Sequence, residues 1–121
     1  MRGSLLIIAL LCTGCESMEE EDPCDRMPAL DYANWGRGFM SKHCTGCHSN
    51  LVPDDHRNEA PVEVDLDTFA DALHFSGRIE ARVLLAPVDD LMPPGGGPTE
   101  GEKKLLDEWL TCSVFPTLEE E

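Results

Sequence analysis

Apolar side chains recur with helical spacing in residues 31–43. This stripe consists of Tyr32, Trp35, Phe39 and Met40. Spacings of three and four residues place such side chains on one face of a helix, and Asp31 is suited to cap its N-terminus. Gly36 costs this helix about 1 kcal/mol relative to alanine. Because the close approach of another helix would account for the missing side chain, we expect a partner to pack at Gly36.

A second apolar stripe lies near the C-terminus. It consists of Leu105, Leu106, Trp109, Leu110 and Cys112. Thr99 and Glu102 precede it with the spacing of a capping box, which marks a helix N-terminus. We expect this helix to end at about Cys112 and to be the partner that packs against residues 31–43.

Two shorter helices are predicted between these segments, in residues 67–75 and 78–85, with a break at Ser76 and Gly77. The side chains that we expect in the core, or in the wall of a ligand site, are Phe69, Leu73, Ile79, Val83 and Leu84. Residues 49–64 are rich in proline, aspartate and asparagine, which predicts a loop. The pattern therefore indicates a small all-α domain in residues 25–121.

The N-terminus has the layout of a bacterial export signal. A seven-residue apolar run, 5–11, follows Arg2 and is too short to span a bilayer. The run ends at Thr13, Gly14 and Cys15, which resembles a lipoprotein lipobox, although Cys12 stands where leucine is usual. The resemblance implies a signal peptide in residues 1–14 and acylation of Cys15, hence an anchor in the cell envelope that faces the periplasm. An ordinary secretory signal is the alternative.

Charge limits the class of partner. The net charge is −15 and the pI is about 4.4, which argues against nucleic acid or an anionic lipid surface as a partner. Residues 16–23 contain five acidic residues among eight, so we expect residues 15–24 to form a solvated tether. The membrane would be reached only through the lipid, and protein partners would be basic.

The stretch SKHCTGCHSN contains Cys44, Cys47 and His48 in the pattern CxxCH. This is the attachment signature of c-type haem, in which both thiols bond to the porphyrin and the histidine ligates the iron. A structural zinc site generally needs four ligands, and this chain offers one CxxC pair and two isolated cysteines. A thioredoxin-like dithiol would need a βαβ context, which the pattern lacks. The cysteines left over, Cys24 and Cys112, lead to the hypothesis of a disulfide in an oxidising compartment.

Further features carry a resemblance to the class I cytochromes c. Gly36, Phe39 and Met40 precede CTGCH, and LLDEWL lies near the C-terminus, which resembles the crossing helix pair of that family. The resemblance implies a small cytochrome c fold around one covalent haem, with Trp109 packed against Gly36. Trp109 and Pro93 are also candidate residues of the haem pocket. Met40 departs from the family, where an aromatic residue is common.

The segment LMPPGGGPT resembles the Met-Pro loop of the same family. Met92, followed by Pro93 and Pro94, would then be the distal iron ligand, with His74 as the rival and an open site as a further alternative. The His48 ring should donate its free N–H to a backbone carbonyl, and the family implies a proline carbonyl after CxxCH. The choices are Pro53 and Pro61. Arg78 and Arg82 are candidates to pair with haem propionates, and surface ion pairs are the alternative.

These features together predict an electron carrier that passes single electrons between redox proteins in the periplasm. It is not expected to be an enzyme, because both axial positions of the iron are filled and no serine or cysteine nucleophile has an evident histidine and acid beside it. The alternatives are a haem-based gas or redox sensor, a haem subunit of a larger oxidoreductase, and a zinc-binding module.

Overall fold

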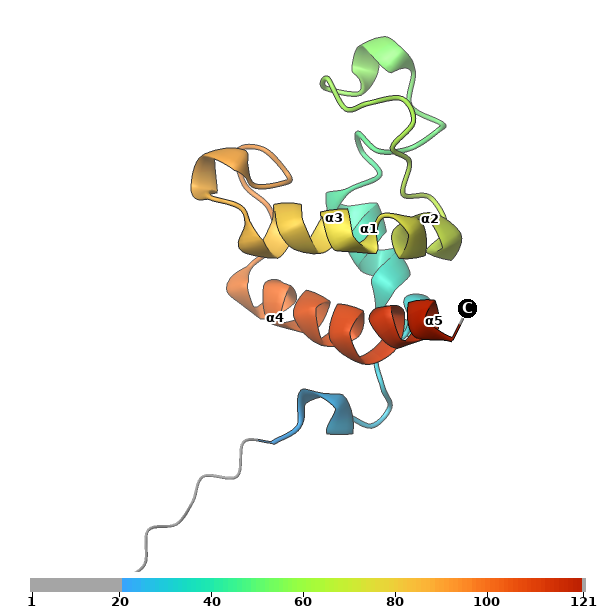
Figure 1. Cartoon of the computed structure of the whole chain (residues 1–121). Helices are drawn as coiled ribbons and strands as arrows, with labels where there is room; N and C mark the ends of the chain where they lie inside the picture. The colour runs from blue at the N-terminus through green and yellow to red at the C-terminus, as the bar shows by residue number, and fades with distance from the viewer. Residues whose placement is uncertain (1–20, 121) are drawn as a thin grey trace, which may run out of the picture.

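The computed structural model describes residues 21–120, and within this range the chain is helical and contains no strand (Figure 1). Elements labelled η are short 3₁₀ or π-helical turns. In chain order the elements are η1 (Pro23–Asp25), η2 (Tyr32–Gly36), α1 (Arg37–His43), η3 (Asp54–His56), α2 (Phe69–His74), α3 (Ser76–Ile79), η4 (Glu80–Leu85), η5 (Val88–Asp90), α4 (Glu100–Trp109), η6 (Leu110–Val114) and α5 (Phe115–Glu119). The expected signal peptide, Cys15 and most of the expected tether lie outside the described residues.

The first long helix consists of η2 and α1 and confirms the helix predicted in residues 31–43. Asp31 is its N-cap and forms a reciprocal capping box with Asn34. The Asp31 carboxylate accepts from the Asn34 backbone N–H at 2.7 Å, and the Asn34 side chain accepts from the Asp31 N–H at 2.9 Å. The cap satisfies two backbone donors that the first turn leaves without partners.

The C-terminal helix begins as predicted but ends later. Thr99 caps α4, with its side chain accepting from the Glu102 N–H at 3.2 Å and the Glu102 carboxylate accepting from the Thr99 N–H at 2.9 Å. The expected end at Cys112 is wrong, because η6 and α5 continue the helix to Glu119. Val114 is fully buried and extends the apolar stripe by one more turn.

The helix α3 begins at Ser76, so the predicted break at Ser76 and Gly77 is also wrong. The interruption lies at Phe75, which ends α2. The Ser76 hydroxyl donates to the Leu73 carbonyl at 2.8 Å and keeps the chain turning across the junction. Of the side chains expected in the core, Ile79 and Val83 are buried, and Leu73 and Leu84 pack against the core. Phe69 is 36% exposed and lies against the Tyr32 ring.

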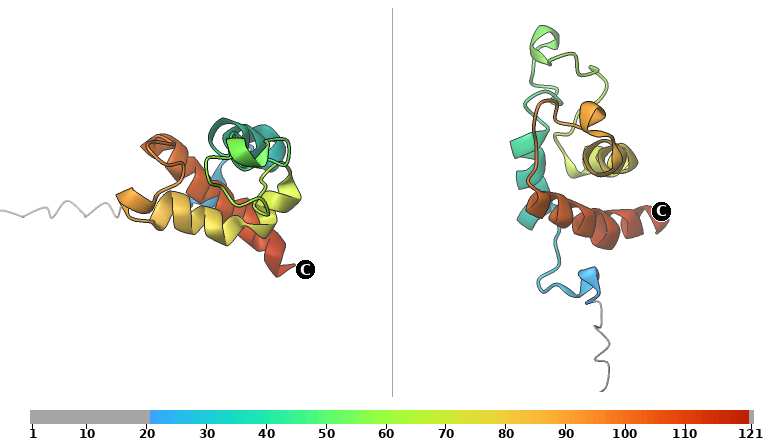
Figure 2. Two further views of the ribbon diagram at one scale, coloured as in Figure 1. Left: turned by 90° about the horizontal axis from the view of Figure 1, so that it is seen from above. Right: turned by 90° about the vertical axis from the view of Figure 1, so that its left-hand side faces the viewer.

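The N- and C-terminal helices cross at Gly36, as expected. A Cβ atom at Gly36 would lie 2.5 Å from the Trp109 ring, so the two helices approach to a distance that only glycine permits. Trp109 is fully buried, with the Trp35 ring 5.9 Å and the Tyr32 ring 6.4 Å away between centroids. The helix of α3 and η4 packs on the C-terminal helix, as two views at right angles show (Figure 2).

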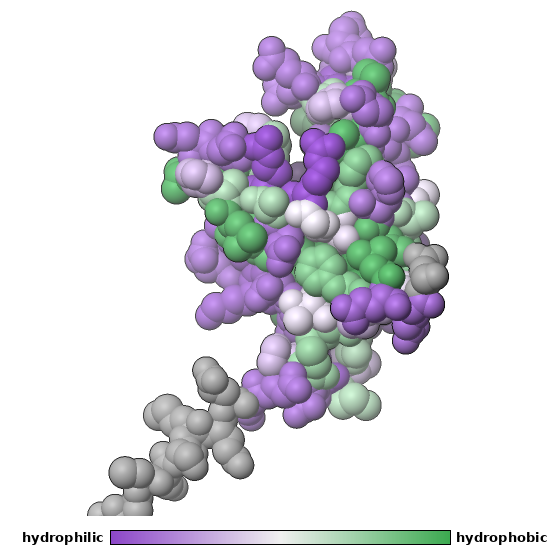
Figure 3. Space-filling view, viewed as in Figure 1, coloured by the Kyte–Doolittle hydropathy of each residue, from purple (hydrophilic) through white to green (hydrophobic). Residues whose placement is uncertain are grey.

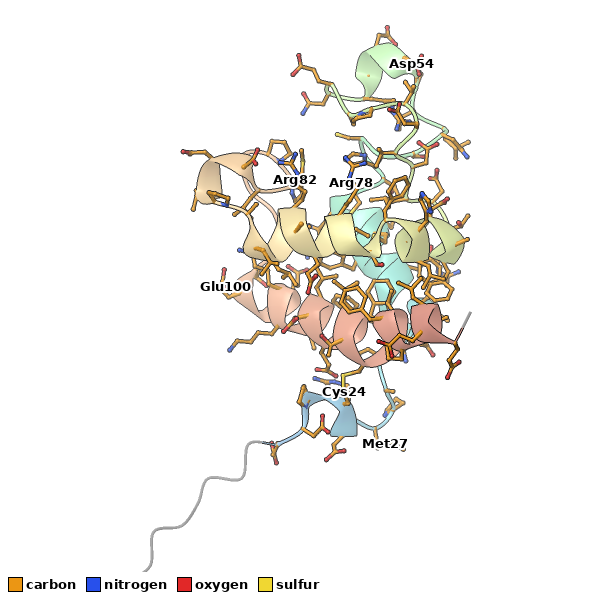
Figure 4. The ribbon with its side chains drawn as sticks, in the orientation of Figure 1. Cys24, Met27, Asp54, Arg78, Arg82 and Glu100 are labelled. Atoms are coloured by element: carbon orange, nitrogen blue, oxygen red, sulfur yellow. A yellow bond between two sulfur atoms is a disulfide. The ribbon has the colours of Figure 1, made fainter. Side chains whose placement is uncertain are left out.

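The segment that precedes the first long helix is fastened to the C-terminal helix. Cys24 and Cys112 form a disulfide with 5.4 Å between their Cα atoms, so the pairing that the sequence left as a hypothesis is present in the structure (Figure 4). Arg26 pairs with Glu108, and the Ser113 hydroxyl donates to the Leu30 carbonyl. These contacts hold η1 against the side of the C-terminal helix that faces away from α3 and η4 (Figures 1 and 2).

Candidate functional site

A cavity of about 470 Å³ lies between α1, the helix formed by α3 and η4, and residues 92–98. Its walls come from α1, the turn after α1, residues 58–66, the helix of α3 and η4, and residues 92–98. The apolar part of the lining includes Phe39, Val64, Leu66, Phe75, Ile79, Val83 and four prolines. In Figure 3 the surface is hollowed between two lobes, with strongly hydrophilic side chains at the rim. A volume of this size suits one small-molecule ligand or cofactor.

One turn of chain carries Cys44, Cys47 and His48 along the wall of this cavity. The Cys44 carbonyl accepts from the Cys47 N–H at 3.1 Å and from the His48 N–H at 2.9 Å. The turn continues α1 directly, because the Cys44 N–H donates to the Met40 carbonyl at 2.8 Å. The CxxCH residues are therefore presented together from the end of a rigid helix.

Both thiols of the turn are free, and Cys44 and Cys47 are not joined to each other. Burial raises the pKa of Cys44 to about 12, since an apolar environment disfavours the thiolate. Cys44 therefore stays a thiol at neutral pH.

The His48 ring is oriented by one backbone carbonyl. Its Nδ1 lies 3.0 Å from the Val64 oxygen, and the His48 carbonyl in turn accepts from the Leu66 N–H at 2.9 Å. A carbonyl oxygen can only accept, so the Nδ1 atom carries the proton, and Nε2 is the ring nitrogen that remains for a metal ion. The expected donation to a backbone carbonyl is thus present.

The expected choice between Pro53 and Pro61 as the carbonyl partner of His48 is wrong, because the Nδ1 of His48 lies against the Val64 oxygen. The Pro53 carbonyl accepts from the His56 N–H at 2.8 Å, and the Pro61 carbonyl accepts from the Arg57 guanidinium at 2.9 Å. Pro53 is exposed and does not line the cavity, whereas Pro61 does.

Arg57 is a feature of the site that the sequence did not indicate. It is only 2% exposed. Its guanidinium donates to the Ser49 carbonyl, to the Val64 carbonyl at 3.0 Å and to the Asp65 carboxylate at 2.9 Å, besides Pro61. An arginine in a segment rich in proline and aspartate is expected in solvent, and no local pattern distinguishes Arg57 from such a residue.

Met92 reaches the cavity from another segment. It lines the cavity with 37% of its surface exposed, and its N–H donates to the Arg82 carbonyl at 2.9 Å, which ties the segment to η4. Pro93 also lines the cavity, and a Cβ atom at Gly97 would lie 2.6 Å from the Pro93 ring. Gly97 therefore packs directly against Pro93, the residue that follows Met92.

The histidines other than His48 are engaged elsewhere. His74 is exposed, stacks edge-on against Phe75 and is not part of the cavity lining, so the structure brings Met92 and not His74 to the cavity. His43 lines the cavity, but its Nε2 lies 3.1 Å from the Glu102 carboxylate. His56 is exposed beside Asp55.

The two arginines at the mouth of the cavity differ in their contacts (Figure 4). Arg82 forms an ion pair with Asp90 at 2.9 Å, the alternative that the sequence left open for it. The Arg78 guanidinium lies over the Phe75 ring at 5.9 Å from its centroid. In the described part of the chain no carboxylate lies within 4.0 Å of Arg78, so Arg78 can receive an anionic group at the mouth.

Trp109 belongs to the helix crossing and does not line the cavity. Among residues 21–120, no three side chains of histidine, cysteine, aspartate or glutamate gather as metal ligands would. The disulfide also engages two of the cysteines that a four-ligand zinc site would need. No helix in this range has the length and apolar content to cross a membrane.

Comparison of the chain with protein-family models, with curated proteins and with solved structures finds no match.

Proposed function

We propose that the protein is a mono-haem c-type cytochrome of the class I kind that carries single electrons. One observation carries the proposal: Cys44, Cys47 and His48 line the same cavity as Met92, which comes from a separate segment. Two free thiols, an imidazole with a protonated Nδ1 and a thioether are the donor set of haem c. The apolar lining and the volume of about 470 Å³ also suit a porphyrin.

The residues of the chain have distinct roles in this proposal. The thiols of Cys44 and Cys47 would hold the porphyrin through its two vinyl groups, with one C–S bond at each vinyl and the thiol proton on the other vinyl carbon. His48 Nε2 and Met92 Sδ would hold the iron, and Arg78 would pair with a propionate. When bound, haem supplies an iron that alternates between ferric and ferrous states. The soft sulfur of Met92 favours the ferrous state and so raises the reduction potential.

A carrier fits these residues better than an enzyme does. With His48 and Met92 both holding the iron, no position on the metal would remain for a substrate. The helix crossing at Gly36 and Trp109 supports a cytochrome c fold, since it joins the helix before CxxCH to the last helix. The net charge of −15 favours basic redox partners, which such a surface attracts over long range.

The proposed location is the periplasmic side of the bacterial cell envelope, with a lipid on Cys15. This part of the proposal rests on the sequence alone. It agrees with the disulfide between Cys24 and Cys112, because disulfides persist in exported proteins and are rare in the cytosol of most organisms.

Covalent attachment tests the proposal directly. The chain is produced with its own signal in a bacterium that expresses haem-attachment machinery, and pigment is followed in a denaturing gel together with the intact mass. We expect pigment and the added mass of one haem in the parent protein, and neither in the Cys44→Ser/Cys47→Ser variant. A colourless parent protein that carries no haem mass contradicts the proposal.

The distal ligand is tested by Met92→Ala in the pigmented protein. We expect loss of the near-infrared band of a sulfur-to-iron bond, while the matched variant His74→Ala keeps it. An unchanged band in Met92→Ala refutes the assignment of Met92. Rapid binding of CO by the reduced parent protein at neutral pH would favour a gas sensor instead of a carrier.

A further inference from the structure

We propose that Arg57 is a positioning residue that raises the reduction potential of the iron through the carbonyl of Val64. The inference rests on the proposed function, because it concerns the haem ligand His48. Arg57 does not line the cavity itself, so it has no direct contact with a group held there.

The guanidinium of Arg57 closes the loop that follows the CxxCH turn. It donates hydrogen bonds to the Ser49, Pro61 and Val64 carbonyls and to the Asp65 carboxylate. The Nη1 atom donates to the Ser49 carbonyl, and Nη2 is shared among the other three acceptors, so the buried charge is held in one geometry. Nε has no hydrogen-bond partner within residues 21–120. The Val64 oxygen is thus one of four acceptors that Arg57 gathers.

Two donors share the Val64 oxygen. His48 Nδ1 lies 3.0 Å from it, and Arg57 Nη2 also lies 3.0 Å from it. A carbonyl oxygen has two lone pairs and can accept both bonds. The guanidinium is the stronger donor, because its hydrogen bond is assisted by charge. By withdrawing electron density from the oxygen, Arg57 makes Val64 a weaker acceptor for the imidazole N–H.

The weaker acceptor changes what His48 offers the iron. Hydrogen bonding at the outer nitrogen of a ligating histidine raises the basicity of the ring. A weakened bond leaves the ring closer to a neutral imidazole, which donates less electron density and stabilises ferric iron less. The ferrous form is then favoured. Because His48 and Arg57 both donate to the Val64 carbonyl, the reduction potential is higher than it would be if His48 were the sole donor.

A direct charge effect can be separated from this one. Arg57 and Asp65 are 2.9 Å apart and form a pair with no net charge. Arg57→Lys keeps the positive charge beside Asp65 but loses the planar fork that reaches several carbonyls at once. Arg57→Gln loses both the charge and the fork. The lysine variant is therefore the decisive one.

The experiment measures the midpoint potential of the purified, haem-loaded parent protein and of the two Arg57 variants. The control is Arg26→Gln, which removes another ion-paired arginine on the far side of the C-terminal helix. We expect both Arg57 variants to have lower potentials, with a change of up to about tenfold in the ferric-to-ferrous equilibrium constant, or about 59 mV for one electron. Arg26→Gln should keep the parent potential.

The second readout is the NMR spectrum of the His48 ring protons in the ferric protein, which should shift in Arg57→Lys and not in Arg26→Gln. If Arg57→Lys keeps the parent potential while Arg57→Gln lowers it, charge alone acts and the inference is wrong. If Arg57→Lys fails to accumulate with haem, Arg57 is a folding residue and the inference is also wrong. A parent protein without haem contradicts the proposed function instead.

Discussion

One carboxylate, that of Glu102, joins the ends of two helices beside the cavity. Its Oε1 accepts from the Lys42 ammonium at 2.6 Å and lies 3.1 Å from the Nε2 of His43, both at the end of α1. Its Oε2 accepts from the Thr99 N–H at the start of α4. These hydrogen bonds, led by that of Lys42, lower the pKa of Glu102 from 4.5 to about 2. The ionised form is therefore the one that the folded state prefers.

This preference predicts how stability responds to acid. A carboxyl group whose pKa is lowered in the folded state stabilises that state above the unfolded pKa of 4.5, and the contribution is lost as the pH falls toward about 2. In urea unfolding at a series of pH values, we expect Glu102→Gln to lower the free energy of unfolding near neutral pH. As the pH is lowered from neutral, the free energy of unfolding should also decrease less in the variant than in the parent protein.

Glu100→Gln is the matched control, because Glu100 lies on the same turn and its exposed carboxylate contacts only Lys103 at 3.0 Å. It should reproduce the acid profile of the parent protein. Equal profiles for Glu102→Gln and the parent would show that the contact between α1 and α4 contributes nothing to the pH dependence.

Single residues differ in how far the sequence alone predicts them. Asp31 and Thr99 could be assigned as caps, because a cap depends on residues three positions away. Arg57 could not be assigned a role. Its burial depends on three carbonyls and a carboxylate that converge only when residues 49–65 fold back on the CxxCH turn. The Val64 partner of His48 was missed for the same reason.

At the scale of elements, the crossing of the two terminal helices depends on one missing side chain. Gly36→Ala would place a Cβ atom 2.5 Å from Trp109. Although alanine improves helix propensity by about 1 kcal/mol, overpacking a filled core costs about 1 to 3 kcal/mol. We expect Gly36→Ala to lower the free energy of unfolding, as measured by denaturant titration.

Gly38→Ala is the control for this substitution within the same helix. Among residues 21–120, no atom outside its own turn of helix lies within 4 Å of the position that its Cβ atom would take. We expect it to stabilise the protein by up to about 1 kcal/mol, the difference in helix propensity. Opposite signs at two glycines of one helix would isolate the contact with Trp109. A stabilising effect at Gly36 as well would mean that the helices can move apart at no cost.

The elements themselves were predictable where apolar spacing and caps agree, as in the first and last long helices. The errors occurred at boundaries. Ser76 and Gly77 have poor helix propensity, but the hydroxyl of Ser76 bonds back to Leu73 and the helix resumes at once. Pro116 is disfavoured inside a helix, but the chain stays helical through it, at the junction of η6 and α5.

At the scale of the whole molecule, the disulfide between Cys24 and Cys112 closes nearly the entire domain into one loop. The two cysteines are 88 positions apart. In the chain-entropy view a loop of this length stabilises the folded state by about 4 kcal/mol. We expect the Cys24→Ser/Cys112→Ser variant to lose stability of this order in thermal and denaturant unfolding.

Haem attachment should survive this double substitution, because neither cysteine lines the cavity. The single variants serve as controls for the serine side chains and should each lose as much stability as the pair, since one thiol alone cannot close the loop. Unchanged stability in the double variant would mean that the contacts between Arg26 and Glu108 and between Ser113 and Leu30 already hold the segment.

The same bond decides how the protein responds to tension. If the chain is stretched between its two ends, the force passes from Cys24 through the disulfide to Cys112, and residues 25–111 carry none of it. Every residue that lines the cavity belongs to this segment. A pull that would unravel an unbridged domain therefore does not reach the cavity while the sulfur bridge is intact.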